Sequence, residues 1–132
     1  MTSGTISVVT GAARGIGRAT AQRLALRGDR VYVLDIHENE GDDLTTDAGT
    51  LLACDVTSQQ QVEETVRRIE REEGRVDVLV NNAGGFPVAR RLEELTLEEW
   101  NRSLELNLTS VFLVTKAFLP LLRRADAARV LK

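Results

Sequence analysis

The residues with the clearest chemical potential are three glycines close together near the start of the chain. Gly11, Gly15 and Gly17 lie between an apolar run at 6–9 and a helix-like segment at 18–27. Glycines let the backbone turn tightly and let phosphate oxygens approach it, and the amide N–H groups at a helix N-terminus attract negative charge. This order of strand, glycine turn and helix predicts a site for a dinucleotide pyrophosphate.

An acidic residue closes the next apolar run. Asp35 follows the run 31–34 and lies about 20 residues beyond the turn, where a ribose-binding carboxylate is expected. Its carboxylate would repel the additional phosphate of NADP, which favours NAD. Arg14 favours NADP, because a guanidinium pairs with phosphate, although a solvated Arg14 with no cofactor role is the alternative. Burying a carboxylate beside a phosphate is costly, so we expect NAD rather than NADP.

Two further strand ends carry polar or glycine-rich sequences. The apolar run 51–54 ends in Asp-Val at 55–56, and the run 76–80 ends in Asn-Asn-Ala-Gly at 81–84. Asn and Gly are common in simple turns, so either strand end alone is a weak signal. Their combination with Thr-Gly-Ala-Ala-Arg-Gly-Ile-Gly at 10–17 is specific.

With these segments the chain resembles the short-chain dehydrogenase/reductase family over essentially its whole length. The resemblance implies an α/β fold with a doubly wound, Rossmann-like parallel sheet. It also implies hydride transfer between NAD(H) and an alcohol or carbonyl substrate. Asp55 and Val56 would contact the adenine, and residues 82–84 would line the cofactor pocket. The expected cofactor-binding residues are Gly11, Arg14, Gly15, Ile16, Gly17, Asp35, Asp55, Val56, Asn82, Ala83 and Gly84.

The same family performs its chemistry with an asparagine, a serine, and a tyrosine and lysine spaced Tyr-x-x-x-Lys. Asn107 is the counterpart of the asparagine, which the resemblance implies to hold a water in a proton relay and to mark a helix irregularity. The one tyrosine, Tyr32, has no lysine four residues on. Residues 1–132 therefore resemble one incomplete cofactor-binding domain, expected to bind cofactor without turnover. The alternatives are a non-catalytic NAD-binding or interaction module, and an adenosylmethionine-dependent methyltransferase.

The composition of the chain limits the classes of partner that it can bind. With 17 basic and 20 acidic residues, the chain has no electrostatic footprint for nucleic acid or an anionic membrane. We also see no approach to the roughly 20 consecutive apolar residues of a membrane span. The single cysteine, Cys54, excludes an internal disulfide and suits a reducing cytoplasm. His37 is the sole histidine, so no metal site is expected. We expect a small-molecule substrate and a homo-oligomer.

Strands near 5–10, 30–35, 50–55 and 76–81 alternate with helices, which predicts a parallel sheet truncated after about four strands. The segment at 37–49 is polar and is at best a short helix. Capping boxes are expected for Ser58 with Gln61, and for Thr96 with Glu99 at the start of a helical region reaching about residue 124.

That long helical region is apolar on more than one side, and the resemblance implies that it packs on the sheet and on a partner subunit. The strand at 76–80 is expected to lie between the first strand and a strand beginning near Val130. If that neighbour is cut short, the backbone of 76–80 would be left largely unpaired along an apolar edge. Self-association is therefore expected, or partial unfolding around residues 96–132 while the glycine-turn end stays ordered.

Overall fold

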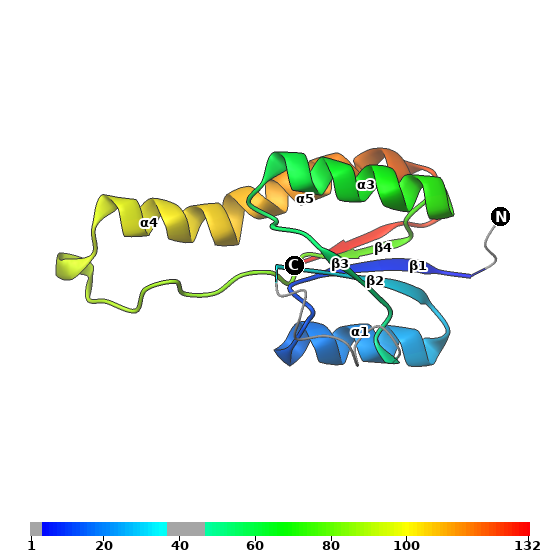
Figure 1. Ribbon diagram of the computed structural model, residues 1–132, viewed down its shortest axis with the longest axis horizontal. Helices are drawn as coiled ribbons and strands as arrows, with labels where there is room; N and C mark the ends of the chain where they lie inside the picture. The colour runs from blue at the N-terminus through cyan, green and yellow to red at the C-terminus, as the bar shows by residue number, and fades with distance from the viewer. Residues whose placement is uncertain (1–3, 37–46) are drawn as a thin grey trace.

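The computed structural model describes residues 4–36 and 47–132, so most of the segment at 37–49 lies outside the described residues. Within the described residues the sheet has five parallel strands in the order β3-β2-β1-β4-β5 (Figure 1). This confirms the doubly wound α/β fold, and the fifth strand is the one expected to begin near Val130. The strands are β1 (Ile6–Thr10), β2 (Arg30–Asp35), β3 (Thr50–Ala53), β4 (Val78–Val80) and β5 (Arg129–Leu131).

Helices cover both faces of the sheet. α1 (Gly15–Arg27) lies on one face, and α3 (Gln59–Glu73) and α5 (Ser110–Arg123) lie on the other (Figure 1). Because strand residues alternate between faces, Val33 packs with the α1 side while Tyr32 packs with the side of α3 and α5. Both faces are apolar because both are buried.

β4 lies inside the sheet, as expected, but the unpaired edge predicted for it is wrong. Val78 pairs with Arg129 and Val80 with Leu131, so β5 covers the side of β4 opposite β1. The N–H of Asn81 also donates to the Leu131 carbonyl at 2.9 Å. Among the described residues, the open edge on this side of the sheet therefore belongs to β5.

The two predicted capping boxes differ in outcome. Thr96 and Glu99 form the complete reciprocal box at the start of α4 (Leu97–Leu104). Ser58 accepts from the Gln61 backbone N–H, as expected for an N-cap, but the second half of its box is absent. The Gln61 side chain instead accepts from the N–H of Asp55 at 2.8 Å.

The helical region predicted from Thr96 onward is continuous. It runs through α4, a π-helical turn η3 (Glu105–Thr109) and α5, and α4 projects beyond the sheet beside an extended segment (Figure 1). The short 3-10 helix η2 (Leu92–Glu94) lies at the far end of this projection.

By length and composition alone, the run Leu97–Arg123 is long and apolar enough to cross a membrane. The expectation that no segment of the chain would meet this criterion is therefore wrong. This run mixes apolar residues with charged ones, so no uninterrupted apolar stretch marks it in the sequence. Within α5, however, Val114, Phe118 and Leu121 are buried in the same core as β1 and β2. α5 therefore packs as a core helix of the α/β fold.

Candidate functional site

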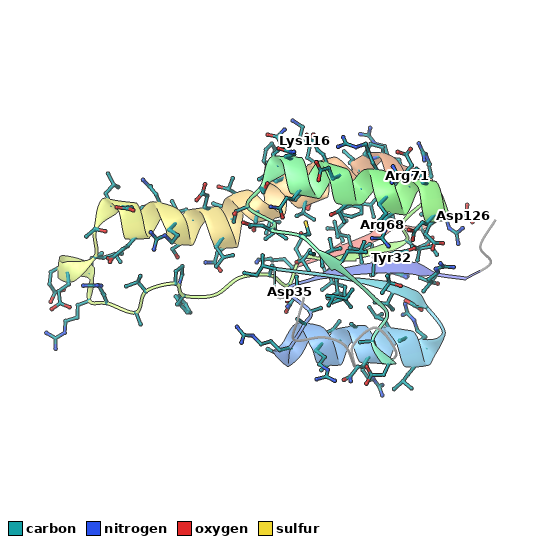
Figure 2. All side chains as sticks on the ribbon, in the orientation of Figure 1. Tyr32, Asp35, Arg68, Arg71, Lys116 and Asp126 are labelled. Carbon is teal, nitrogen blue, oxygen red and sulfur yellow. The ribbon has the colours of Figure 1, made fainter. Side chains whose placement is uncertain are left out.

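One pocket lies at the carboxyl ends of β1 to β4, the edge at which parallel α/β sheets bind ligands. It brings together eight of the eleven predicted cofactor residues with four others that the motifs did not single out. In Figure 2, Asp35 lies at this end of the sheet. The lining residues are Gly11, Arg14, Leu34, Asp35, Ile36, Cys54, Asp55, Val56, Asn82, Ala83, Gly84 and Leu106.

The glycine turn is packed directly against the end of β4. Gly11 has a positive φ of 61°, and a Cβ there would lie 2.7 Å from the Ala83 Cα. A Cβ on Gly17 would overlap the Asn82 amide, which donates to the Gly11 carbonyl at 3.0 Å. The Ala83 N–H donates to the Thr10 hydroxyl at 2.9 Å. Gly11 and Gly17 are therefore needed for the close packing between the two motifs.

The N-terminus of α1 is suited to an anion. The helix begins at Gly15, and its N-cap residue Arg14 has an exposed side chain that makes no capping hydrogen bond. The first turn holds no acidic residue, so nothing there opposes the positive end of the helix dipole. Ile16 and Gly17 belong to this turn without lining the pocket, and the Ile16 side chain is 81% exposed.

Asp35 has a structural role that its position in the motif did not reveal. It is 8% exposed, and its Oδ2 accepts from the Ala13 N–H at 2.9 Å in a buried hydrogen bond. The Asp35 backbone carbonyl accepts from the Cys54 N–H at 2.9 Å, which joins the ends of β2 and β3. The carboxylate is therefore held in place by the glycine turn itself.

The Asp-Val pair after β3 forms a tightly bonded turn. Asp55 Oδ1 accepts from both the backbone N–H and the hydroxyl of Thr57, at 2.9 and 2.7 Å. Val56 is buried beside it. Cys54 is a buried free thiol in the same pocket, and burial raises its pKa, so the thiol is a wall of the site rather than a nucleophile.

Asn107 lies in the π-helical turn η3, so the helix irregularity implied by the resemblance is present. Its Nδ2 donates to the carbonyls of Gly85 and Ser103 at 2.7 and 2.9 Å, and its Oδ1 accepts from the Gly85 N–H at 2.9 Å. Asn107 does not line the pocket, but the preceding residue, Leu106, does. The π-helical turn thus links the helix to the chain just after the Asn-Asn-Ala-Gly segment.

Tyr32 is not built for proton transfer with a substrate. It is fully buried, and its hydroxyl lies 2.7 Å from Glu72 Oε2 and 2.6 Å from Glu73 Oε1. Burial first, and then these two carboxylates, raise the pKa of Tyr32. Figure 2 shows Tyr32 beneath α3 and away from Asp35. A general acid/base near neutral pH needs the opposite shift.

Within residues 4–36 and 47–132, no three His, Cys, Asp or Glu side chains are grouped so that they could hold a metal ion. His37 lies outside these ranges. The absence of a metal site therefore stays a prediction from the sequence.

Comparisons with known proteins agree with this geometry. A family model described as short chain dehydrogenase matches residues 5–132. The 3-oxoacyl-acyl-carrier-protein reductase FabG of Escherichia coli is 38% identical over 131 residues, which cover 97% of this chain and 53% of that protein. The L-fucose dehydrogenase of Oryctolagus cuniculus is 37% identical over 125 residues, covering 93% and 44%. The chain spans about half the length of the curated relatives it matches.

Solved structures share the fold of this chain. The ligand-free aldohexose dehydrogenase of Thermoplasma acidophilum superposes with a TM-score of 0.87 at 33% identity, covering 96% of this chain and 48% of that one. A short chain dehydrogenase from Shigella flexneri, solved in complex with NADP, gives a TM-score of 0.86 at 26% identity, with 96% and 56% covered.

Proposed function

The chain belongs to the short-chain dehydrogenase family, and from that premise we propose that it forms the cofactor-binding part of an oxidoreductase. The reaction would be hydride transfer between NAD(H) and a small-molecule alcohol or carbonyl compound. The proposal rests above all on the pocket that unites the glycine turn, Asp35 and the Asn-Asn-Ala-Gly strand end. A bound nicotinamide cofactor supplies the hydride chemistry, and this chain binds and orients it.

The described residues fit such a cofactor from one end of the pocket to the other. The uncapped N-terminus of α1 and the glycine turn would hold the pyrophosphate. The Asp35 carboxylate would accept from the adenosine ribose hydroxyls. Asp55 and Val56 would contact the adenine, and residues 82–84 would form the wall beside the nicotinamide half.

We propose NAD as the preferred cofactor. The carboxylate of Asp35 is largely buried at the pocket, whereas Arg14 is exposed at its mouth. A phosphate placed beside Asp35 would lose its solvation and meet a fixed negative charge. A guanidinium in solvent recovers little of that cost.

The test compares two changes at one position. Asp35→Asn keeps an oxygen that can accept from the Ala13 N–H but removes the charge, whereas Asp35→Ala removes both. We expect the wild-type chain to bind NAD at least about tenfold more tightly than NADP, with each tenfold equal to about 1.4 kcal/mol. Asp35→Asn is expected to bring the two dissociation constants together. Asp35→Ala is expected to weaken both by loosening the turn.

Equilibrium titration of the wild type and both variants with NAD and NADP measures these constants. Tighter binding of NADP by the wild-type chain would contradict the preference and make Arg14 the deciding residue.

The catalytic contribution proposed for this chain is limited to Asn107, which would support the proton relay of the complete protein. Tyr32 is buried away from the pocket, with its pKa raised rather than lowered. We therefore propose that the 132 residues alone bind cofactor without turning over alcohols.

A homo-oligomer in a reducing cytoplasm completes the proposal. The outer side of the long helical region carries exposed apolar side chains that a second subunit would cover. The free thiol of Cys54 is compatible with a reducing compartment. The exposed apolar residues of this helical region are Leu97, Trp100, Leu104, Leu108, Phe112 and Leu119.

A further inference from the structure

The loop that joins β3 to α3 contains a side-chain hydrogen bond that no motif predicts. Gln61, in the first turn of α3, accepts through Oε1 from the N–H of Asp55 at 2.8 Å. The backbone of Gln61 is itself fixed. Its N–H donates to Ser58 Oγ at 3.3 Å, and its carbonyl accepts from the Thr65 hydroxyl at 2.9 Å. The backbone of Gln61 is therefore held at both of its polar groups, while its side chain accepts from Asp55.

The carbonyl and one carboxylate oxygen of Asp55 also form hydrogen bonds within this loop. Its carbonyl accepts from the Ser58 N–H at 3.0 Å, and its Oδ1 accepts from the N–H and hydroxyl of Thr57. In the part of the chain that the structure describes, Oδ2 is left without a hydrogen-bond partner. Asp55 and the buried Val56 line the pocket, so an oriented acceptor lies where a base would be bound.

The chemistry of that acceptor distinguishes between purines. Adenine presents an exocyclic amino group, which is a donor suited to a carboxylate. Hypoxanthine presents a carbonyl oxygen at the same position, and a carboxylate would repel it. We infer that Gln61 is a positioning residue for adenine: by holding the Asp55 backbone it orients the carboxylate that selects adenine over hypoxanthine. This inference rests on the proposed cofactor function.

Three variants separate this role from general support of the helix. Gln61→Met keeps the length of the side chain but removes the acceptor for the Asp55 N–H. Gln61→Glu keeps the acceptor, and an added negative charge in the first turn of a helix is tolerated. Gln60→Met is the matched control, because Gln60 is the neighbouring residue of α3 and its side chain donates to the exposed Glu64 at 3.1 Å instead of accepting from Asp55.

The experiment measures dissociation constants of the full chain for AMP and for inosine monophosphate, together with amide hydrogen exchange at Asp55. We expect the wild type to prefer AMP. In Gln61→Met, we expect AMP binding to weaken by about fivefold, the size of one neutral hydrogen bond, with inosine monophosphate binding unchanged and the Asp55 amide exchanging faster. Gln61→Glu and Gln60→Met are expected to keep the wild-type ratio.

An unchanged ratio in Gln61→Met would overturn the inference. So would an equal loss for both nucleotides, or a wild type that binds them equally, while the proposed function would stand if NAD still binds. A wild-type chain that binds neither the nucleotides nor NAD would overturn the proposed function and the inference with it.

Discussion

At the scale of single residues, Asp35 and Tyr32 show how one strand serves two environments. Both are buried on β2. They lie on opposite faces of the sheet, because successive side chains of a strand alternate between its faces and these two residues are three positions apart. Asp35 is held by the Ala13 N–H at the pocket. Tyr32 is held between Glu72 and Glu73 at the end of α3, where Arg68 and Arg30 pair with the two carboxylates.

The environment of Tyr32 predicts a loss of stability at alkaline pH. Its pKa in the folded chain is raised above the usual value of about 10, mainly by burial. A raised pKa means that the stabilisation is complete below about pH 10 and falls as the pH rises further, because only the unfolded chain releases the proton there. Tyr32 is the only tyrosine, so ultraviolet absorbance of tyrosinate reports on this residue alone.

We expect tyrosinate to appear only above pH 10 and together with unfolding followed by circular dichroism. The matched variant Tyr32→Phe should have a free energy of unfolding about 1–2 kcal/mol lower at neutral pH. Its stability should then fall less steeply than that of the wild type as the pH rises above about 10. Ionisation near pH 10 with the fold intact would show that the hydroxyl is not buried between the carboxylates.

At the scale of elements, the π-helical turn η3 fixes the projecting segment to the sheet. A π turn shifts the backbone hydrogen-bond pattern, and here the Asn107 side chain donates to the Ser103 carbonyl one turn earlier. The same amide makes a paired hydrogen bond with both backbone groups of Gly85. Through Gly85, the position of the helix is coupled to the wall of the pocket.

Replacing Asn107 tests this coupling. Asn107→Ala removes three hydrogen bonds, two of them to Gly85, and is expected to lower the free energy of unfolding by about 1–3 kcal/mol. The Gly85 amide should exchange with solvent markedly faster. Asn101→Ala, at an exposed position of α4, is the control and should change neither quantity. Unchanged exchange at Gly85 in Asn107→Ala would contradict the role assigned to η3.

The sequence predicted those features that local backbone chemistry decides. The glycine turn, the strand-ending Asp35 and the capping box of Thr96 each follow from residue types at fixed spacing. The hydrogen bonds that Asp35 accepts from the Ala13 N–H and that Gln61 accepts from the Asp55 N–H were missed, because they depend on side-chain rotamers and on how separate elements pack. The capping box expected for Ser58 was half wrong for this reason, since Asp55 competes for the same glutamine.

Other features depended on the whole sheet. Leu106, in the π turn, lines the pocket, and its apolar type carried no signal of that in the sequence. The register of β5 on β4 was likewise set by tertiary pairing, and it removed the unpaired edge expected at β4.

At the scale of the whole molecule, the exposed apolar face of the long helical region is the surface most suited to a second copy. Leu108 is 65% exposed and Phe112 is 60% exposed, on adjacent turns of η3 and α5. Contiguous apolar surface of this kind is rare on monomers. We expect the average mass in sedimentation to rise with concentration.

Leu108→Glu should shift the chain toward monomer, because it places a charge in the centre of that face. The control Leu26→Glu changes an even more exposed leucine, in α1 on the other side of the sheet, and should leave the association unchanged. A monomer at every concentration, or the same response to both variants, would contradict an interface on this face.

We propose above all that a dinucleotide binds in the pocket at the carboxyl ends of the strands. Two-dimensional amide NMR during a titration with NAD tests it residue by residue. We predict saturable shifts at residues 11–17, 35–36, 55–56 and 82–84, with Lys116 on α5 unaffected. Absence of shifts at saturating NAD, or shifts confined to α3 and α5, would contradict the claim.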